Sequence, residues 1–561
     1  MTWPYRAGLA VLLLVTALTY RGALRNNFVW DDTHTVVNNR AIDSLREAPR
    51  WFTQPETTST LRETNYRPVL VASFAVDVAL WGRRPGGFHA VNIALHLGVV
   101  LLTYALALRA WGRPAGALAA AALAALHPIN GEAVNYISAR SSLLSAAFVL
   151  AAVLAWDTSA GQRRSVSKIA ASLGLGVLAL GVKESAVVLP ALILVWDRLT
   201  DPAEASWTDS LRRSWPWWAL VAAYLAWRHV VLSESAPADL VGDGALQALA
   251  FTAKLFLASL GAWLLPIGWA IDHGWSWHIG FGEGAALAVG AIAAAAATVA
   301  LWRWDPKLGW CTAWFWVSLA PLAALPWVSR LTLYQDHRVY LAQIGLALAG
   351  GEIIRRAATT LPVPQYRLIA VGAPAALLAA LAIHTTAKRI PVWRDADTLW
   401  AYTLAQYPTS ALARNHAALR RLEAGKLAVA REQFEASIAL APNFPVTHNY
   451  LGVVYARQGE LDRAIAEFTT AIKLSPSFVS ARMNLGNAYE KSGRPDLALA
   501  AYEQGIPDQP WAVDLIERAA RLFERAGRQD DAQARYRRIL TIDPTHASAR
   551  SALAESSPEV E

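Results

Sequence analysis

The sequence contains a single cysteine, Cys311, and two methionines among its 561 residues. One thiol excludes a disulfide framework within the chain and any metal site built from several cysteines. Charged residues are also scarce, at 17% of the chain, whereas hydrophobic residues make up 55% and tryptophan occurs 25 times. Nothing in the sequence resembles a Walker loop, a zinc-protease motif or a nucleophile elbow. Much of the Ala-, Leu- and Trp-rich stretch of the first 390 residues cannot form a soluble domain, which predicts a polytopic membrane region.

Lysine is rare beside arginine, with 8 lysines and 43 arginines, and this composition together with abundant alanine suggests a GC-rich bacterial genome. The formal charge of +8 is unevenly placed, because residues 411–561 carry 19 cations and 19 anions. The surplus therefore belongs to the membrane region, where basic loops mark the cytoplasmic side. Nucleic-acid binding is not needed to explain the net positive charge of the chain.

Loop charges predict the topology. With a cytoplasmic N-terminus, every cytoplasmic loop carries at least two cations, whereas the loops over 233–244 and 267–283 carry none. Both flanks of 246–266 therefore face outward, so this segment should be re-entrant or interfacial. Residues 67–81 are short for a span and should lie on the membrane surface. We predict eleven crossings in a bacterial inner (plasma) membrane, with the C-terminal region on the extracytoplasmic side.

The C-terminal region repeats with a period of 34 residues. Small, aromatic and proline positions recur in register, as in Gly425, Gly459, Gly493 and Gly527, Ala430, Ala464, Ala498 and Ala532, Phe434, Phe468, Tyr502 and Tyr536, and Pro442, Pro476, Pro510 and Pro544. This is the tetratricopeptide pattern of paired helices. The predicted fold class is therefore all-α: a membrane domain over 1–390 with a first outer loop at 22–87, a capping half-repeat or linker over 391–410, four repeats over 411–546 in an α-solenoid, and a tail over 547–561.

Two adjacent acids, Asp31 and Asp32, follow the first membrane-length segment. Adjacent carboxylates repel, and desolvation raises the pKa of at least one of them. An aspartate that caps a helix or turn is the structural alternative. The other outer-side turns also carry ionisable groups, namely His127, Glu132 and Arg140, Lys183 and Glu184, Asp272 and His273, and Asp336, His337 and Arg338. Each has a structural explanation taken singly, but their convergence on one membrane face predicts a functional site.

Carboxylates and cations at an outer membrane face suit one reaction in particular. A hydroxyl that attacks a sugar linked to a lipid phosphate needs a carboxylate to accept its proton, and cations to hold the departing phosphate. The phosphate leaving group is already acidic, so no general acid is required.

The motifs resemble those of the transmembrane and tetratricopeptide-repeat (TMTC) glycosyltransferases, which are related to the protein O-mannosyltransferases of the wider GT-C fold. The stretches that carry the resemblance are Asn27–Asp32, Tyr66–Pro68, His127–Val134, Ala139–Ser141, Lys183–Ser185, Leu265–Pro266 with Asp272–His273, and Asp336–Tyr340. The resemblance implies a GT-C-like membrane domain, a polyprenyl-phosphate-linked sugar donor with mannose as one candidate, a protein hydroxyl as acceptor, and inversion at the sugar.

The same resemblance assigns roles to residues. Asp31 would be the general base with Asp32 beside it, and the candidates for binding the donor phosphate are Arg140, Lys183, His337 and Arg338. Supporting residues of the outer face would be Arg67, His127, Glu132, Glu184, Asp272 and Tyr340. Family members often carry a Glu-Arg-Tyr version of the late motif, from which the run Asp336–Tyr340 departs.

Two other functions compete with this interpretation. A membrane-anchored repeat scaffold has no use for carboxylates and cations gathered at one face, and a transporter of a lipid-linked sugar would place ionisable groups at mid-membrane depth. The expected partners are a polyprenyl-phosphate-linked sugar, a protein or peptide acceptor bound by the repeats, and membrane lipids, with no nucleic acid. No metal site and no cofactor is firmly predicted, and the sequence leaves open whether a divalent cation assists.

Overall fold

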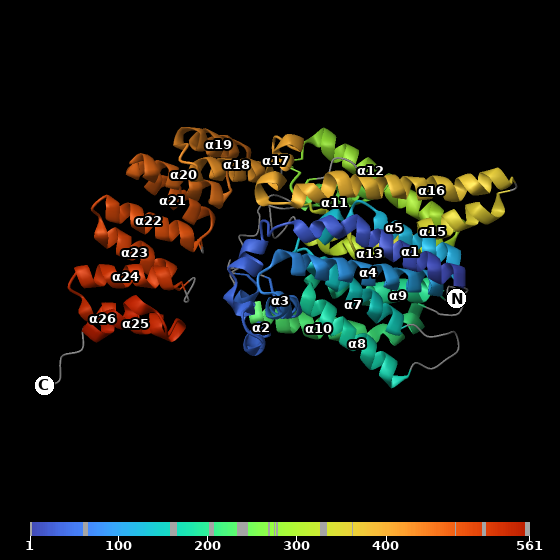
Figure 1. Cartoon of the computed structure of the whole chain (residues 1–561), viewed down its shortest axis with the longest axis horizontal. Coiled ribbons are helices and arrows are strands. Elements are labelled where there is room, and N and C mark those ends of the chain that lie inside the picture. The colour runs from blue at the N-terminus through green and yellow to red at the C-terminus, as the bar shows by residue number, and fades with distance from the viewer. Residues whose placement is uncertain are drawn as a thin grey trace. The chain divides into compact units, whose positions relative to one another are not determined.

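The computed structural model describes residues 3–59, 65–156, 165–200, 207–232, 245–266, 270–273, 275, 279–325, 334–361, 363–476, 478–507 and 512–555. Within these ranges every regular element is a helix or a short helical turn, which confirms the all-α prediction. The chain divides into two compact units, Met1–Tyr402 and Thr403–Glu561, and each has a hydrophobic core of its own (Figure 1). The acidic loop over 233–244, used above to predict the topology, lies outside the described residues.

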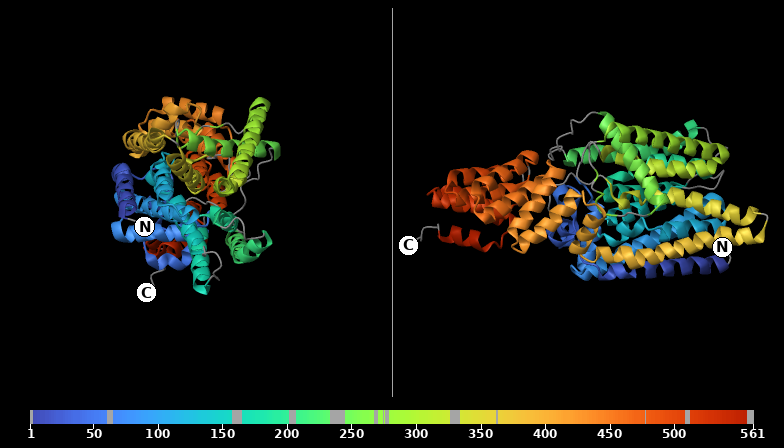
Figure 2. Two further views of the ribbon diagram at one scale, coloured as in Figure 1. Left: turned by 90° about the vertical axis from the view of Figure 1, so that its right-hand side faces the viewer. Right: turned by 90° about the horizontal axis from the view of Figure 1, so that it is seen from above.

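The first unit is built from helices that run side by side over much of their length (Figure 2). They are α1 (Trp3–Tyr20), α2 (Ala48–Trp51), α3 (Pro68–Trp81), α4 (Pro85–Trp111), α5 (Pro114–Leu126), α6 (Asn130–Asn135), α7 (Arg140–Trp156), α8 (Val166–Val182), α9 (Leu189–Thr200), α10 (Trp207–Leu232), α11 (Ala245–Leu264), α12 (Phe281–Trp304), α13 (Pro306–Leu319), α15 (Gln343–Thr360) and α16 (Pro364–His384). Short turns join them, including η1 (Arg21–Arg25), η2 (Thr33–Val37), η6 (Glu184–Val188) and η8 (Asp336–Val339). Proline opens α3, α4, α5 and α13, at a position where its missing N–H costs no helical hydrogen bond.

Five segments among the described residues are long and apolar enough to cross a membrane: Trp3–Arg25, Pro85–Trp111, Ala245–Leu264, Phe281–Trp304 and Leu368–Trp393. Shorter apolar helices accompany them at Pro68–Trp81, Pro114–Leu126, Arg140–Trp156 and Val166–Val182. Helix α12 has no buried residue although it is almost wholly apolar, as expected for a helix surrounded by lipid. The first unit is therefore that of an integral membrane protein, and the eleven crossings stay a prediction.

Small residues let the central helices pack closely. Helix α5 packs against α15, and five alanines of α5 are buried: Ala117, Ala120, Ala121, Ala124 and Ala125. A Cβ atom added to Gly351 of α15 would lie 2.6 Å from both the Ala120 nitrogen and the Gly116 oxygen. Glycine and alanine thus allow a close backbone approach that a larger side chain would prevent.

Many helix ends meet at one end of this unit, which we call the site end. It comprises the end of η1, the turns η2, η6 and η8, and helix α6. The Asn26 side chain joins two of these segments, because its amide donates to Asn135 Oδ1 and to the Ile390 carbonyl, both at 3.4 Å. Residues far apart in the sequence are therefore brought together here.

Helix α3 has both of its ends at the site end. Before its first residue, Arg67 donates to Glu184 of η6 at 2.9 and 3.1 Å. After its last residue, Arg83 donates to the Val36 and Asn39 carbonyls of the first loop at 3.1 and 2.7 Å. A helix that crossed the bilayer could not make both contacts, so they support the prediction that this segment lies on the membrane surface.

Helix α11 also keeps to the site end. Lys254 near its middle pairs with Glu283 in the first turn of α12, with 2.7 Å between Nζ and Oε1. Trp263 near its end stacks on His127, which follows α5. Although α11 is long enough to span, these contacts support the predicted re-entrant or interfacial position.

The second unit is a series of antiparallel helix pairs, visible in Figure 1 from α18 onward. Its helices are α17 (Ala396–Gln406), which contains the boundary between the units, and then α18 (Ala411–Glu423), α19 (Leu427–Leu440), α20 (Pro445–Gln458), α21 (Leu461–Leu474), α22 (Val479–Lys491), α23 (Pro495–Gly505), α24 (Val513–Arg525), α25 (Gln529–Ile542) and α26 (Ala547–Glu555). The four glycines of the 34-residue period have φ between 72° and 83°. They end the first helix of each pair in the left-handed conformation that other residues adopt only at a cost.

The segment after the repeats contains one more helix. Within the predicted tail over 547–561, Ala547–Glu555 forms helix α26. Ala549 is buried in the core that α24 and α25 share. The last helix pair would otherwise expose this apolar face, so α26 covers it.

Candidate functional site

The first loop presents its two adjacent acids very differently. Asp32 is fully buried, whereas the Asp31 side chain is 36% exposed. Between η1 and these acids, Trp30 adopts φ 48°, and it is the one residue other than glycine with positive φ among those described. Its indole stacks on Tyr136 with ring centroids 6.0 Å apart. This left-handed residue, which costs about 1 kcal/mol or more, turns the chain so that the two carboxylates point in different directions.

Asp32 fastens the loop to the turn before α7. Its Oδ1 accepts from the Ser138 amide at 2.8 Å and from the Ser138 hydroxyl at 2.6 Å, and its Oδ2 accepts from the Val29 amide at 3.0 Å. Burial raises the pKa of Asp32 to about 7, against the opposing effect of these donors. Both carboxylate oxygens of Asp32 thus accept hydrogen bonds from the protein, and these bonds hold the loop in place.

Asp31 remains accessible at the surface of the site end. His34, one helical turn later, places Nε2 3.2 Å from Asp31 Oδ1. The hydroxyl of Thr35 donates to the Asp31 carbonyl at 2.8 Å, which braces the backbone behind the carboxylate. An accessible carboxylate on a braced loop is the arrangement expected of a base that must meet a substrate hydroxyl.

A buried acid–histidine pair lies between α6 and η8. Glu132 Oε1 is 2.6 Å from His337 Nδ1, and Glu132 Oε2 accepts from the Asp336 amide at 2.8 Å. Burial and the nearby Asp336 carboxylate raise the pKa of Glu132. Burial, together with the neighbouring Lys183, lowers the pKa of His337. The pair orders η8, and an uncharged His337 can offer a phosphate only a hydrogen bond.

Three cations gather next to this pair. Arg67 is neutralised by the two hydrogen bonds that it donates to Glu184. Lys183 donates to the Ser142 hydroxyl at 2.7 Å, and burial followed by the charge of Arg67 lowers the pKa of Lys183 to about 7. Arg338 donates through Nε to Gln335 Oε1 at 3.1 Å, whereas its buried Nη1 has no hydrogen-bond partner among the described residues.

Within the described part of the chain, neither Lys183 nor Arg338 forms an ion pair with a carboxylate. Burial lowers the pKa of Arg338 to about 10, and nearby carboxylates, Asp31 among them, act in the opposite direction. Arg67 forms an ion pair with Glu184, whereas the carboxylates near Lys183 and Arg338 act on these two cations only from beyond ion-pair distance. A buried guanidinium nitrogen without an acceptor costs free energy unless a ligand supplies one.

Other predicted residues lie in structural positions. Arg140 is fully buried and pairs with Asp77 of α3, with Nη2 2.5 Å from Oδ2. Nη2 also donates to the Phe88 carbonyl at 2.9 Å, Nε donates to Asn92 Oδ1 at 2.8 Å, and Nη1 donates to the Ser73 carbonyl at 3.4 Å. The guanidinium is thus saturated by protein groups and lies over the Phe74 ring. These contacts favour a structural role for Arg140 over phosphate binding.

Tyr340 and His127 also serve packing. The Tyr340 hydroxyl is 2.6 Å from His96 Nδ1 inside the bundle. His127 Nδ1 accepts from the Ile129 amide at 3.2 Å, so Nε2 carries the proton and donates to the Trp263 carbonyl at 2.8 Å. Asp272 is partly exposed next to buried Ile271. The site end therefore brings together Asp31, Asp32, Arg67, Glu132, Lys183, Glu184, His337 and Arg338 of the predicted set.

Sequence reasoning missed Ser138, His34 and Tyr136. Ser138 lies just before the Ala139–Ser141 motif, and His34 lies three residues after Asp31, so their proximity to chosen motifs was the only available signal. Among the described residues no group of three or more histidine, cysteine or acidic side chains is arranged to hold a metal ion.

Comparison with known proteins supports both halves of the interpretation. A tetratricopeptide-repeat family model matches residues 415–477 and 451–510, which confirms the predicted repeats. Protein O-mannosyl-transferase TMTC1 of Mus musculus is 34% identical over 208 residues, which are 34% of this chain and 22% of that protein. This chain resembles the TMTC proteins. Human TMTC1 is 35% identical over 209 residues, covering 34% of this chain and 24% of its own length. Human TMTC4 is 31% identical over 216 residues, which are 34% of this chain and 28% of that protein.

The TMTC resemblance predicted from the motifs is thus confirmed. The aligned part spans about a quarter of the length of these curated relatives. Among solved structures, the crystal structure of MamA covers 27% of this chain with 21% identity and a TM-score of 0.25.

Proposed function

We propose that the protein is a membrane glycosyltransferase that moves a sugar, with mannose as the first candidate, from a polyprenyl-phosphate donor to a hydroxyl of a protein acceptor. The observation that carries the proposal is an accessible carboxylate at the same end of the membrane unit as two buried cations that form no ion pair with a described residue. The carboxylate is Asp31 on the first loop, and the cations are Lys183 and Arg338, of which Arg338 is close enough to interact with Asp31. The names of the TMTC relatives support the same class of reaction.

The proposed reaction has balanced roles for these groups. The acceptor oxygen forms a bond to the anomeric carbon of the sugar while the bond from that carbon to the phosphate oxygen breaks. The acceptor proton goes to Asp31, and the electron pair of the broken bond stays on the lipid phosphate. Lys183 and Arg338 stabilise the charge that develops on that phosphate. Attack opposite the leaving group inverts the anomeric carbon.

The structure suggests how the remaining candidates contribute. Asp32 positions Asp31 through Ser138, and the Glu132–His337 pair positions Arg338 through the backbone of η8. We place the site end on the extracytoplasmic side, where the repeats would hold the acceptor. A carboxylate accessible at a helix end, rather than at mid-depth, disfavours the transporter alternative.

The test uses the purified full chain in proteoliposomes, with polyprenyl-phosphate mannose as donor and an acceptor rich in serine and threonine. Asp31→Asn should lower turnover by roughly two to four orders of magnitude with donor affinity retained, because the amide cannot accept the proton. Asp32→Asn should lower turnover by a smaller factor. Arg338→Ala should weaken donor binding about tenfold, because a charge-assisted phosphate contact is lost. Glu47→Gln, at a partly exposed acid of the same loop that pairs with Arg50, is the matched control.

Two outcomes contradict the proposal. Wild-type turnover in Asp31→Asn would contradict the role of Asp31 as general base. Unchanged donor affinity in Arg338→Ala would contradict the role of Arg338 in binding the phosphate. The topology is tested separately in a Cys311→Ser background, since the single native thiol is buried. A thiol from Lys491→Cys, at an exposed helix end, should react from outside intact cells. Labelling only after permeabilisation would reverse the orientation.

A further inference from the structure

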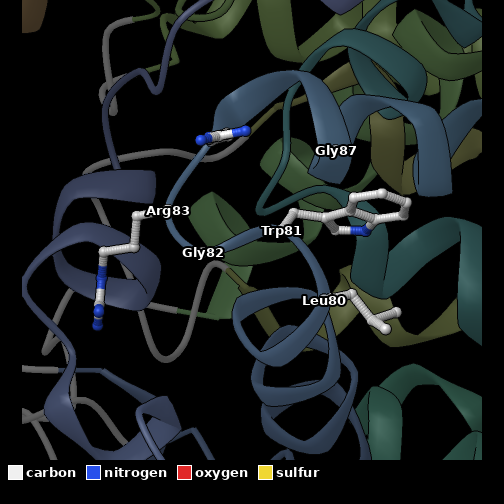
Figure 3. A pocket seen from close by; sticks show the side chains of 6 residues that line it. Leu80, Trp81, Gly82, Arg83 and Gly87 are labelled. Atoms are coloured by element: carbon white, nitrogen blue, oxygen red, sulfur yellow. The ribbon is translucent and has the colours of Figure 1, made fainter.

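The turn between α3 and α4 encloses an open pocket at the edge of the site end. It has a volume of about 540 Å³ and is lined by Leu80, Trp81, Gly82, Arg83, Arg84 and Gly87 (Figure 3). None of the residues assigned above to the reaction lines it. Its walls differ in character, with Leu80 and Trp81 on one side and Arg83 directed away on the other (Figure 3).

One wall is an apolar edge that no described residue covers. Val76 and Trp81 are each 45% exposed, and Leu80 is 64% exposed. Trp81 is held in place by Gly87, where an added Cβ would lie 2.5 Å from the indole Cγ. Only a residue without a side chain lets the indole lie against the start of α4.

The position of this edge indicates what surrounds it. Helix α4, a 27-residue segment long enough to cross the bilayer, begins at Pro85, four residues after Trp81. Both ends of α3 contact the site end, through Arg67 and Arg83. The apolar edge of α3 therefore lies at the depth where α4 enters the hydrocarbon, the level at which tryptophan and arginine meet lipid headgroups.

The two arginines of the turn differ in the hydrogen bonds and ion pairs that their guanidinium groups form. Arg83 donates to two carbonyls of the first loop and pairs with Asp43, with Nη1 2.6 Å from Oδ1. Its charge is thus compensated within the protein. Arg84 is exposed, and within the described part of the chain its guanidinium has no hydrogen bond or ion pair. The pocket therefore combines one uncommitted cation with an exposed indole.

We propose that this pocket binds the phosphate headgroup of a phospholipid from the surrounding bilayer. Arg84 would pair with the phosphate oxygens through its planar guanidinium, and an acyl chain would lie along Val76, Leu80 and Trp81. This lipid would be distinct from the sugar donor, since the pocket shares no residue with the cluster of Lys183 and Arg338. It would hold the surface helix α3, whose other end carries the Arg67–Glu184 pair.

Native mass spectrometry of the full chain in detergent tests the site. Dioleoyl-phosphatidylglycerol is titrated, with dioleoylglycerol as a probe without phosphate and glycerol phosphate as a probe without acyl chains. The wild type should retain one more phospholipid than Arg84→Ala, and that variant should bind it about tenfold more weakly, because one charge-assisted contact is lost. Trp81→Ala should weaken binding in the same direction. Arg46→Ala, an exposed arginine of the first loop, is the control and should match the wild type.

The arms separate the alternatives. Equal phospholipid binding by Arg84→Ala and Arg46→Ala overturns the proposal. Equal affinity for glycerol phosphate would make the pocket a free-phosphate site, and equal affinity for dioleoylglycerol would make it an apolar contact without headgroup recognition. The exposed Arg84 side chain forms no hydrogen bond or ion pair with a described residue, so its variants should stay folded, and Arg84→Lys should restore binding in part.

Discussion

Replacing Asp77 by asparagine tests whether Arg140 is structural or binds the donor. Arg140 is 0% exposed and Asp77 is 2% exposed, and their side chains meet at 2.5 Å. Removing one partner of a buried ion pair costs about 3–5 kcal/mol, because the other charge is left uncompensated. The asparagine and backbone acceptors of Arg140 remain in the variant, so we expect a loss near the lower limit, about 3 kcal/mol.

The assay is thermal unfolding of the detergent-solubilised chain, followed by donor titration of the same samples. Asp77→Asn and Arg140→Leu should each lower the unfolding midpoint by several degrees. The double variant should be more stable than the sum of the single effects predicts, because it leaves no buried charge. Asp77→Asn should leave the donor affinity of the folded fraction unchanged. An Arg140→Leu variant of wild-type stability that no longer binds donor would refute the reasoning and restore Arg140 to the phosphate site.

Three further predictions concern the loop, the cations and the repeats. Ser138→Ala removes one hydrogen-bond donor to the buried Asp32 carboxylate. Turnover should therefore fall about tenfold while the affinity for the sugar donor stays unchanged, as measured by steady-state kinetics and equilibrium binding. An equal loss of affinity would contradict a positioning role. The pKa of Lys183 is lowered to about 7, so its charge is present below that value and lost above it. Donor affinity should therefore fall as the pH rises from 6 to 8, and Lys183→Arg should remove that dependence, whereas a flat wild-type profile would exclude the lysine. Gly452→Ala places a Cβ 2.6 Å from Phe468 Cε1. The free energy of unfolding of the isolated unit over 403–561, followed by circular dichroism, should therefore fall by about 1–3 kcal/mol. Unchanged stability would mean that α20 and α21 do not pack as described.

Part of the site was accessible from the sequence because it depends on local patterns. The first loop follows a membrane-length apolar segment, so Asp31 and Asp32 had to lie near the bilayer surface. Lys183 and Arg338 were selected for the same reason, as charges at the ends of apolar helices. The sequence pattern does not reveal which residue each charged side chain contacts. Those contacts decide whether a cation is free to bind a ligand.

The sequence by itself determined the helical class, the apolar character of the first unit and the repeats of the second. Those features follow from short-range periodicity: a 34-residue spacing places each glycine at the same helix end, where φ is positive. Even so, periodicity did not reveal α26, because a single capping helix has no repeat to match.

Only the tertiary structure shows which charged residues are buried in contacts with other residues and which remain accessible. Asp32 became a fastening residue because Ser138, 106 positions away, meets its carboxylate. Arg140 pairs with Asp77 from another helix, whereas the Nη1 of Arg338 has no acceptor among the residues that the structure describes. Such pairings depend on how helices pack across long sequence separations, and no local pattern of residues encodes them. The free energy of a buried charge is set by the neighbours that packing supplies, which is why only the folded chain separates Arg338 from Arg140.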